Sequence, residues 1–193
     1  RLDLNEGVIA VNDYSTLSYS EAFDALFLKA SKEYPFTAEK NVDWMAIYER
    51  IKPLVDKAKT SQDFYKAIRE FTFSVPDGHI GGLTLDPEIF YNESGGSFGM
   101  VLTELSDGRV IVTDVLPGTP AEEAGIQRGA EIISWQDTAV QEAISQVTPT
   151  FGPYSTEHAR HLAQVMFLSR VPPGTRVKLA YKNPNDSFAE QTT

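Results

Sequence analysis

The sequence predicts an α+β protein in which a helical first half is followed by a small β-sheet with two helices. Up to Val75, apolar residues recur every three or four positions, which is the period of a helix that is buried on one face. Beyond that point, short runs of β-prone residues alternate with turns rich in Gly, Pro and Asp. Such a change of period along one chain favours an α+β fold.

Three amphipathic helices are expected in the first half. Ser18 and Glu21 form a capping-box pattern before the first, and Asp43 can cap the second. Thr60 or Ser61 can cap the third. Pro53 should kink or divide the second helix, because proline has no backbone N–H to donate. The segment 85–96, which is punctuated by Gly and Pro, is expected to be a hinge.

The second half predicts a hairpin of two strands, 98–105 and 109–115, joined by the turn Ser-Asp-Gly. A short helix should start at Pro120 after a Thr119 cap. A longer helix, capped by Ser155 or Thr156, should carry its apolar residues on one side. Three further strands are expected: at 129–135, at 175–181 and after the turn at 183–186.

Composition excludes several classes of function. The 193 residues carry 17 basic and 27 acidic side chains, for a net charge of −10, which argues against a nucleic-acid partner. No apolar run reaches the roughly 20 residues of a membrane span. The absence of cysteine removes thiolate nucleophiles and sulfur-ligated zinc. His158 and His161 lack a third ligand in a metal-binding pattern, so we expect neither metal nor cofactor.

The second half resembles a PDZ domain. The resemblance rests on Gly-Ser-Phe-Gly-Met at 96–100, on Pro-Ala-x-x-Ala-Gly at 120–125 and on Gly-x-x-Ile at 129–132. It implies a small, partly open β-barrel with two helices over residues 94–193. The connection 141–155 is longer than is usual in such modules.

The first half, residues 1–93, resembles the helical N-terminal domain of PDZ-containing serine peptidases of the C-terminal processing and tricorn type. Tyr-Pro-Phe at 34–36, Val-Asp-Trp at 42–44 and Asp-Gly-His-Ile at 77–80 carry this resemblance. In that family a peptidase core with the nucleophilic serine follows the PDZ domain. The chain is therefore expected to lack the core and to be inactive alone.

A peptide groove is the first candidate site. A turn such as Phe98-Gly99-Met100 can direct backbone N–H groups at a terminal carboxylate, and a peptide can then add to the following strand. The predicted peptide-binding residues are Phe98, Gly99, Met100, Val101, Leu162 and Met166. Alternatively, these apolar residues form a core and the protein itself fills the groove.

His79 is the candidate catalytic residue. In tricorn-type members, a histidine at this motif acts as general base for a serine of the core, since an imidazole with a pKa near its usual value of about 6.5 can take that proton. In the C-terminal processing branch the base is a lysine of the core, and the histidine is structural. Tricorn members have a serine where Gly78 stands here. Asp77 should bond turn amides or orient His79.

The sequence therefore predicts the substrate-recognition part of a serine peptidase whose PDZ domain binds peptide or protein C-termini. The alternative is a non-catalytic PDZ adaptor or scaffold that binds partner tails. Because members of the family commonly work outside the cytoplasm, an exported location, periplasmic or extracellular, is expected.

Overall fold

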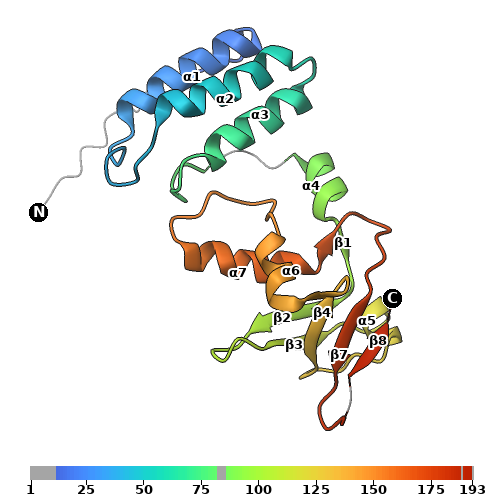
Figure 1. Ribbon diagram of the computed structural model, residues 1–193. Coiled ribbons are helices and arrows are strands. Elements are labelled where there is room, and N and C mark those ends of the chain that lie inside the picture. The colour runs from blue at the N-terminus through green and yellow to red at the C-terminus, as the bar shows by residue number, and fades with distance from the viewer. Residues whose placement is uncertain (1–11, 82–85, 188, 193) are drawn as a thin grey trace, which may run out of the picture. The chain divides into compact units, whose positions relative to one another are not determined.

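Figure 1 shows the computed structural model of the chain, which describes residues 12–81, 86–187 and 189–192. The chain divides into two compact units, Arg1–Ser74 and Val75–Thr193. The first is helical and the second contains the sheet, so the predicted α+β class is confirmed. The division precedes helix α4 (Pro87–Ser94), which contacts strand β6 (Arg170–Val171) of the second unit, whereas the sequence suggested a domain boundary at 93/94.

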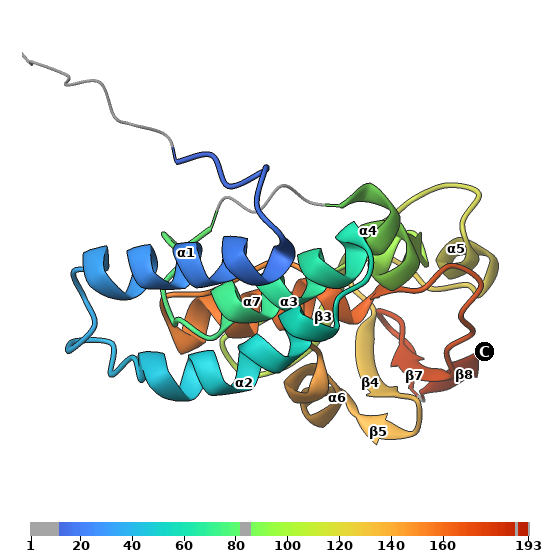
Figure 2. The same ribbon diagram turned by 90° about the horizontal axis from the view of Figure 1, so that it is seen from above.

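The described part of the first unit, from residue 12 onward, contains three helices: α1 (Tyr19–Glu33), α2 (Trp44–Lys57) and α3 (Ser61–Phe73). Helix α2 contacts both of the others, and Figure 2 shows α1 and α2 side by side. The capping box at Ser18 and Glu21 is confirmed, and Thr60 forms a second one with Asp63. These side chains accept hydrogen bonds from backbone N–H groups that have no partner within the first turn of a helix.

The prediction that Pro53 divides the second helix is wrong. Helix α2 runs through Pro53 to Lys57. Ile47, Ile51 and Val55 recur on both sides of the proline and are buried, whereas Pro53 itself is exposed. Burial of this continuous apolar face offsets the one backbone hydrogen bond that the proline cannot donate. The fully buried Phe23 of α1 completes the core, with its ring edge-to-face on Phe71 at 5.4 Å.

The second unit is built on an antiparallel sheet in the order β2-β3-β4-β7-β8, with β5 paired to β4. The hairpin of β2 and β3 is confirmed, and its turn is closed by Gly108 N donating to Leu105 O at 2.9 Å. A separate pair joins β1 to β6. The strands are β1 (Gly96–Ser97), β2 (Met100–Glu104), β3 (Val110–Val115), β4 (Glu131–Trp135), β5 (Thr138–Ala139), β7 (Leu179–Lys182) and β8 (Glu190–Thr192).

Four helices accompany this sheet: α4, α5 (Pro120–Glu123), α6 (Val140–Gln146) and α7 (Glu157–Leu168). The expected hinge at 85–96 is wrong for its described part, because Asp86 caps α4 by accepting from Glu88 N and Ile89 N. Helix α6 occupies part of the long connection 141–155, where the sequence predicted no element. No described helix is long and apolar enough to cross a membrane.

Helix α7 has two apolar faces rather than the single side expected from the sequence. Thr156 caps it by accepting from Ala159 N at 3.1 Å. Ala163 and Phe167 are buried, whereas Leu162 and Met166, one turn apart, are exposed. The buried face holds the helix on the unit's core, which leaves the second face available at the surface.

Candidate active site and peptide groove

The turn before β2 is closely packed at Gly99. Its φ is +76°, a left-handed conformation that favours glycine, and a Cβ there would lie 2.3 Å from side-chain atoms of Thr119. Gly99 O accepts from Leu116 N at 2.7 Å, and Phe98 O accepts from Ala121 N at 3.0 Å. Gly99 N donates to the Ser97 hydroxyl at 3.2 Å. The turn is therefore pinned to the segment that leads into α5.

The predicted peptide groove corresponds to the surface where the edge strand β2 meets α7. Strand β2 ends the order of the described sheet and pairs with β3 on one side, and α7 contacts it (Figure 1). Three predicted peptide-binding residues are exposed here: Val101 on β2 (51%) and Leu162 (53%) and Met166 (56%) on α7. An unpaired strand edge beside exposed apolar side chains is the arrangement needed to add a peptide strand.

Phe98 and Met100, also predicted to bind peptide, lie elsewhere. Met100 is buried, and the Phe98 ring packs edge-to-face on Trp135 with the centroids 5.7 Å apart. Both line a cavity of about 190 Å³ whose other walls come from α5 and Ala124 after it, Ile126, the segment 175–179 that leads into β7, and Thr192. The predicted set is thus split: Phe98 and Met100 face this cavity, whereas Val101, Leu162 and Met166 face solvent.

A contact that the sequence did not predict joins the far end of β2 to α7. Glu104, the last residue of β2, pairs with His161 Nε2. Glu157, four residues before His161 on the same helix, pairs with Arg160. Glu104 and His161 lie 57 positions apart, so no local pattern announces their contact. Among the described residues, no group of three or more His, Asp and Glu side chains is placed to hold a metal ion.

His79 and Asp77 form a hydrogen-bonded pair in the turn after the first unit. Asp77 Oδ1 lies 2.8 Å from His79 Nδ1 and accepts from His79 N at 3.0 Å. The two side chains differ sharply in exposure, at 4% for Asp77 and 93% for His79. The carboxylate is therefore buried and fixed, while the imidazole extends into solvent. Both roles predicted for Asp77 are therefore confirmed: its carboxylate holds the His79 ring, and the same oxygen accepts a hydrogen bond from a turn amide.

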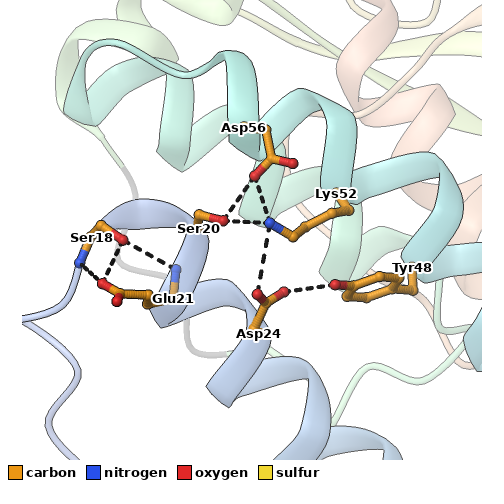
Figure 3. Close-up of polar contacts among 7 residues, drawn as sticks. All are labelled: Ser18, Ser20, Glu21, Asp24, Tyr48, Lys52 and Asp56. Carbon is orange, nitrogen blue, oxygen red and sulfur yellow. Dashed lines mark hydrogen bonds and ion pairs between the residues drawn. The ribbon is translucent and has the colours of Figure 1, made fainter.

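A serine and a lysine also meet in the first unit, as Figure 3 shows. Lys52 contacts Ser20, pairs with Asp56 at 2.6 Å and lies 3.7 Å from Asp24. Its hydrogen bond to Asp56 raises the pKa of Lys52, which outweighs the lowering effect of burial. A lysine that activates a serine needs a lowered pKa instead. The cluster therefore joins α1 to α2 and is not a catalytic pair.

Replacing Lys52 with methionine should lower the stability of the first unit in a pH-dependent way. Hydrogen bonds from Lys52 and Ser20 lower the pKa of Asp56, so this carboxylate stabilises the fold above its unfolded pKa and loses that effect as the pH falls through its folded pKa. The difference in free energy of unfolding between wild type and K52M should be largest near neutral pH and should decrease below about pH 4. Urea unfolding followed by helical circular dichroism measures it. K29M, which removes only the exposed pair with Glu33, is the control, and an equal loss in both variants would contradict the assignment.

Comparisons with known families now identify the two units. Residues 15–73 match the tricorn protease C1 domain, and residues 88–147 match the PDZ domain. The first unit is similar to the tricorn protease C1 domain and the second to the PDZ domain. The resemblance to PDZ-containing peptidases of the C-terminal processing and tricorn type is confirmed. The C1 match covers α1, α2 and α3, and the PDZ match runs from α4 through α6.

Solved structures of CPAF share the fold of this chain. Mature CPAF matches 91% of this chain with a TM-score of 0.57 and 12% identity, and CPAF complexed with lactacystin matches 91% with 0.56 and 13%. The chain spans about a third of those proteins, 33% and 34% of their lengths. The photosystem II D1 C-terminal processing protease aligns with a TM-score of only 0.37 at 18% identity. No curated protein matches the chain significantly by sequence.

Proposed function

We propose that this chain is the substrate-recognition part of a serine peptidase, in which the PDZ domain binds peptide C-termini and His79 is the general base. The nucleophilic serine would then lie outside these 193 residues. The observation that carries the proposal is the pair of Asp77 and His79, a buried carboxylate that holds one nitrogen of an imidazole with 93% of its side chain exposed.

The geometry suits proton transfer at Nε2. With Asp77 ionised, Nδ1 carries the proton and donates it to Oδ1, so the lone pair of the ring is on Nε2. In the proposed reaction, Nε2 takes the proton of the serine hydroxyl as its oxygen attacks the peptide carbonyl. Nε2 then returns this proton to the leaving amine. A histidine with a purely structural role would be expected to bury its ring, and this ring packs against very little.

In this proposal, the predicted groove beside β2 recognises the peptide substrate. A peptide that extends β2 would pair its backbone with the open edge of that strand and place apolar side chains against Val101, Leu162 and Met166. These three apolar side chains are exposed on a strand and a helix that contact each other, and an exposed apolar surface of this kind favours a binding role. The exported location stays a prediction of the family resemblance.

Binding of a fluorescent peptide with an apolar C-terminal residue tests this groove. The change Leu162→Asp should weaken binding by about tenfold or more, because it places a charge on the apolar wall. Ile133→Asp is the matched control, since Ile133 is an exposed apolar residue of β4, and its affinity should equal that of wild type. Equal affinities for L162D and wild type would remove α7 from the recognition site.

A further inference from the structure

The turn that carries His79 is held by a residue 77 positions away in the sequence. Gly78 N donates to the hydroxyl of Ser155 at 2.8 Å. A Cβ on Gly78 would lie 3.4 Å from Pro153 O and from Ser155 Oγ, which is van der Waals contact. The turn at Gly78 therefore lies directly against the segment 153–155.

The same hydroxyl reaches the carboxylate that orients His79. Ser155 Oγ accepts from Gly78 N, so its own proton is available for an acceptor, and Asp77 Oδ1 lies 3.4 Å away in donor geometry. The same oxygen also accepts hydrogen bonds from His79 N at 3.0 Å and from His79 Nδ1 at 2.8 Å. Three donors on one buried carboxylate oxygen restrict its rotation. Ser155 thus spans the turn from Gly78 to Asp77.

Ser155 also connects this turn to the peptide groove. It directly precedes Thr156, the residue that caps α7, and α7 carries the exposed Leu162 and Met166. The hydroxyl is thus presented by the start of the groove helix and comes from the part of the chain that is unusually long for such modules.

We propose that Ser155 is a positioning residue for His79: its hydroxyl fixes the Asp77 carboxylate and thereby holds the imidazole with its proton on Nδ1 and its lone pair on Nε2. This inference rests on the proposed role of His79 as general base. Without the hydroxyl, Asp77 keeps its charge but loses one of the three donors that restrict its rotation. The carboxylate can then turn away from His79 Nδ1, and the ring samples both tautomers.

Nitrogen-15 NMR of the histidine rings in the 193-residue chain tests the inference, because the two tautomers differ in their ring nitrogen shifts. Wild type should show His79 protonated at Nδ1, Ser155→Ala should show a mixture of tautomers, and Ser155→Thr, which restores a hydroxyl, should return toward wild type. Ser145→Ala removes a hydroxyl that bonds Glu142 O in α6 and should leave the His79 signals unchanged. The rings of His158 and His161 on α7 report whether each variant is folded.

The outcomes separate this inference from the proposed function. An Nε2–H tautomer in wild type would contradict the general-base geometry itself. An Nδ1–H tautomer that is equally pure in wild type and in folded S155A would overturn only the role of Ser155. If S155A fails to fold, amide exchange of Gly78 in wild type decides: slow exchange supports the bond to Ser155, and exchange at the rate of an unprotected turn amide overturns it.

Discussion

The change His79→Ala in the intact peptidase that we propose should lower kcat by about 10²–10⁴-fold, the usual contribution of a positioned general base. KM for a peptide substrate should change little. The exposed ring accepts the serine proton and makes few of the contacts that bind the substrate. Steady-state hydrolysis of a peptide with an apolar C-terminal tail measures both constants.

His158→Ala is the matched control for this experiment. His158 is an exposed histidine of the same unit, and we assign it no role in the reaction, so its variant should keep wild-type kcat. Unchanged turnover in H79A would assign His79 a structural role and favour a lysine base in the proposed peptidase core. Absence of any hydrolysis by the intact wild-type protein would favour the alternative of a PDZ adaptor.

A second large effect is expected at Gly99. The change Gly99→Ala combines a left-handed backbone, which costs an L-residue about 1–2 kcal/mol, with a Cβ placed 2.3 Å from Thr119. We expect the free energy of unfolding of the PDZ domain to fall by about 2–4 kcal/mol, with loss of peptide binding in the molecules that remain folded. Urea unfolding of the whole chain, with a titration of the folded state, measures both effects.

Gly118 offers a close control for the contribution of steric overlap. Its φ is +70°, near that of Gly99, but a Cβ there meets no atom within 4 Å. Gly118→Ala should therefore show the backbone cost alone, about 1–2 kcal/mol, and keep its peptide affinity. Equal destabilisation by G99A and G118A would show that the contact with Thr119 relaxes at no cost and that the turn is not tightly packed.

Local chemistry allowed much of this structure to be predicted from sequence. Ser18 with Glu21 marked the start of α1, and the turn at 106–108 marked the hairpin of β2 and β3. Such signals act over a few positions, as caps and turns do. A similar signal at Asp86 and Pro87, a cap followed by proline in the first turn, predicts α4, although the glycines around it suggested a hinge.

The unpredicted features depend on contacts between distant residues. Pro53 was tolerated because burial along α2 outweighs one missing hydrogen bond, a balance that only packing reveals. The pairing of Glu104 with His161 and the approach of Ser155 to the turn at Gly78 span 57 and 77 positions. Neither leaves a periodic trace in the sequence. Pairing of Asp77 with His79, by contrast, spans only two residues and could be anticipated.

Titration of the chain with two peptides that differ only at their last group tests the central claim most directly. One peptide carries a free C-terminal carboxylate after an apolar residue, and its twin is amidated. The account predicts saturable binding of the free acid and loss of binding on amidation. The turn at Gly99 would bind the carboxylate, and Val101, Leu162 and Met166 would contact the apolar side chains of the peptide. Equal binding of both peptides, or binding of neither, would contradict recognition of C-terminal tails by this PDZ domain.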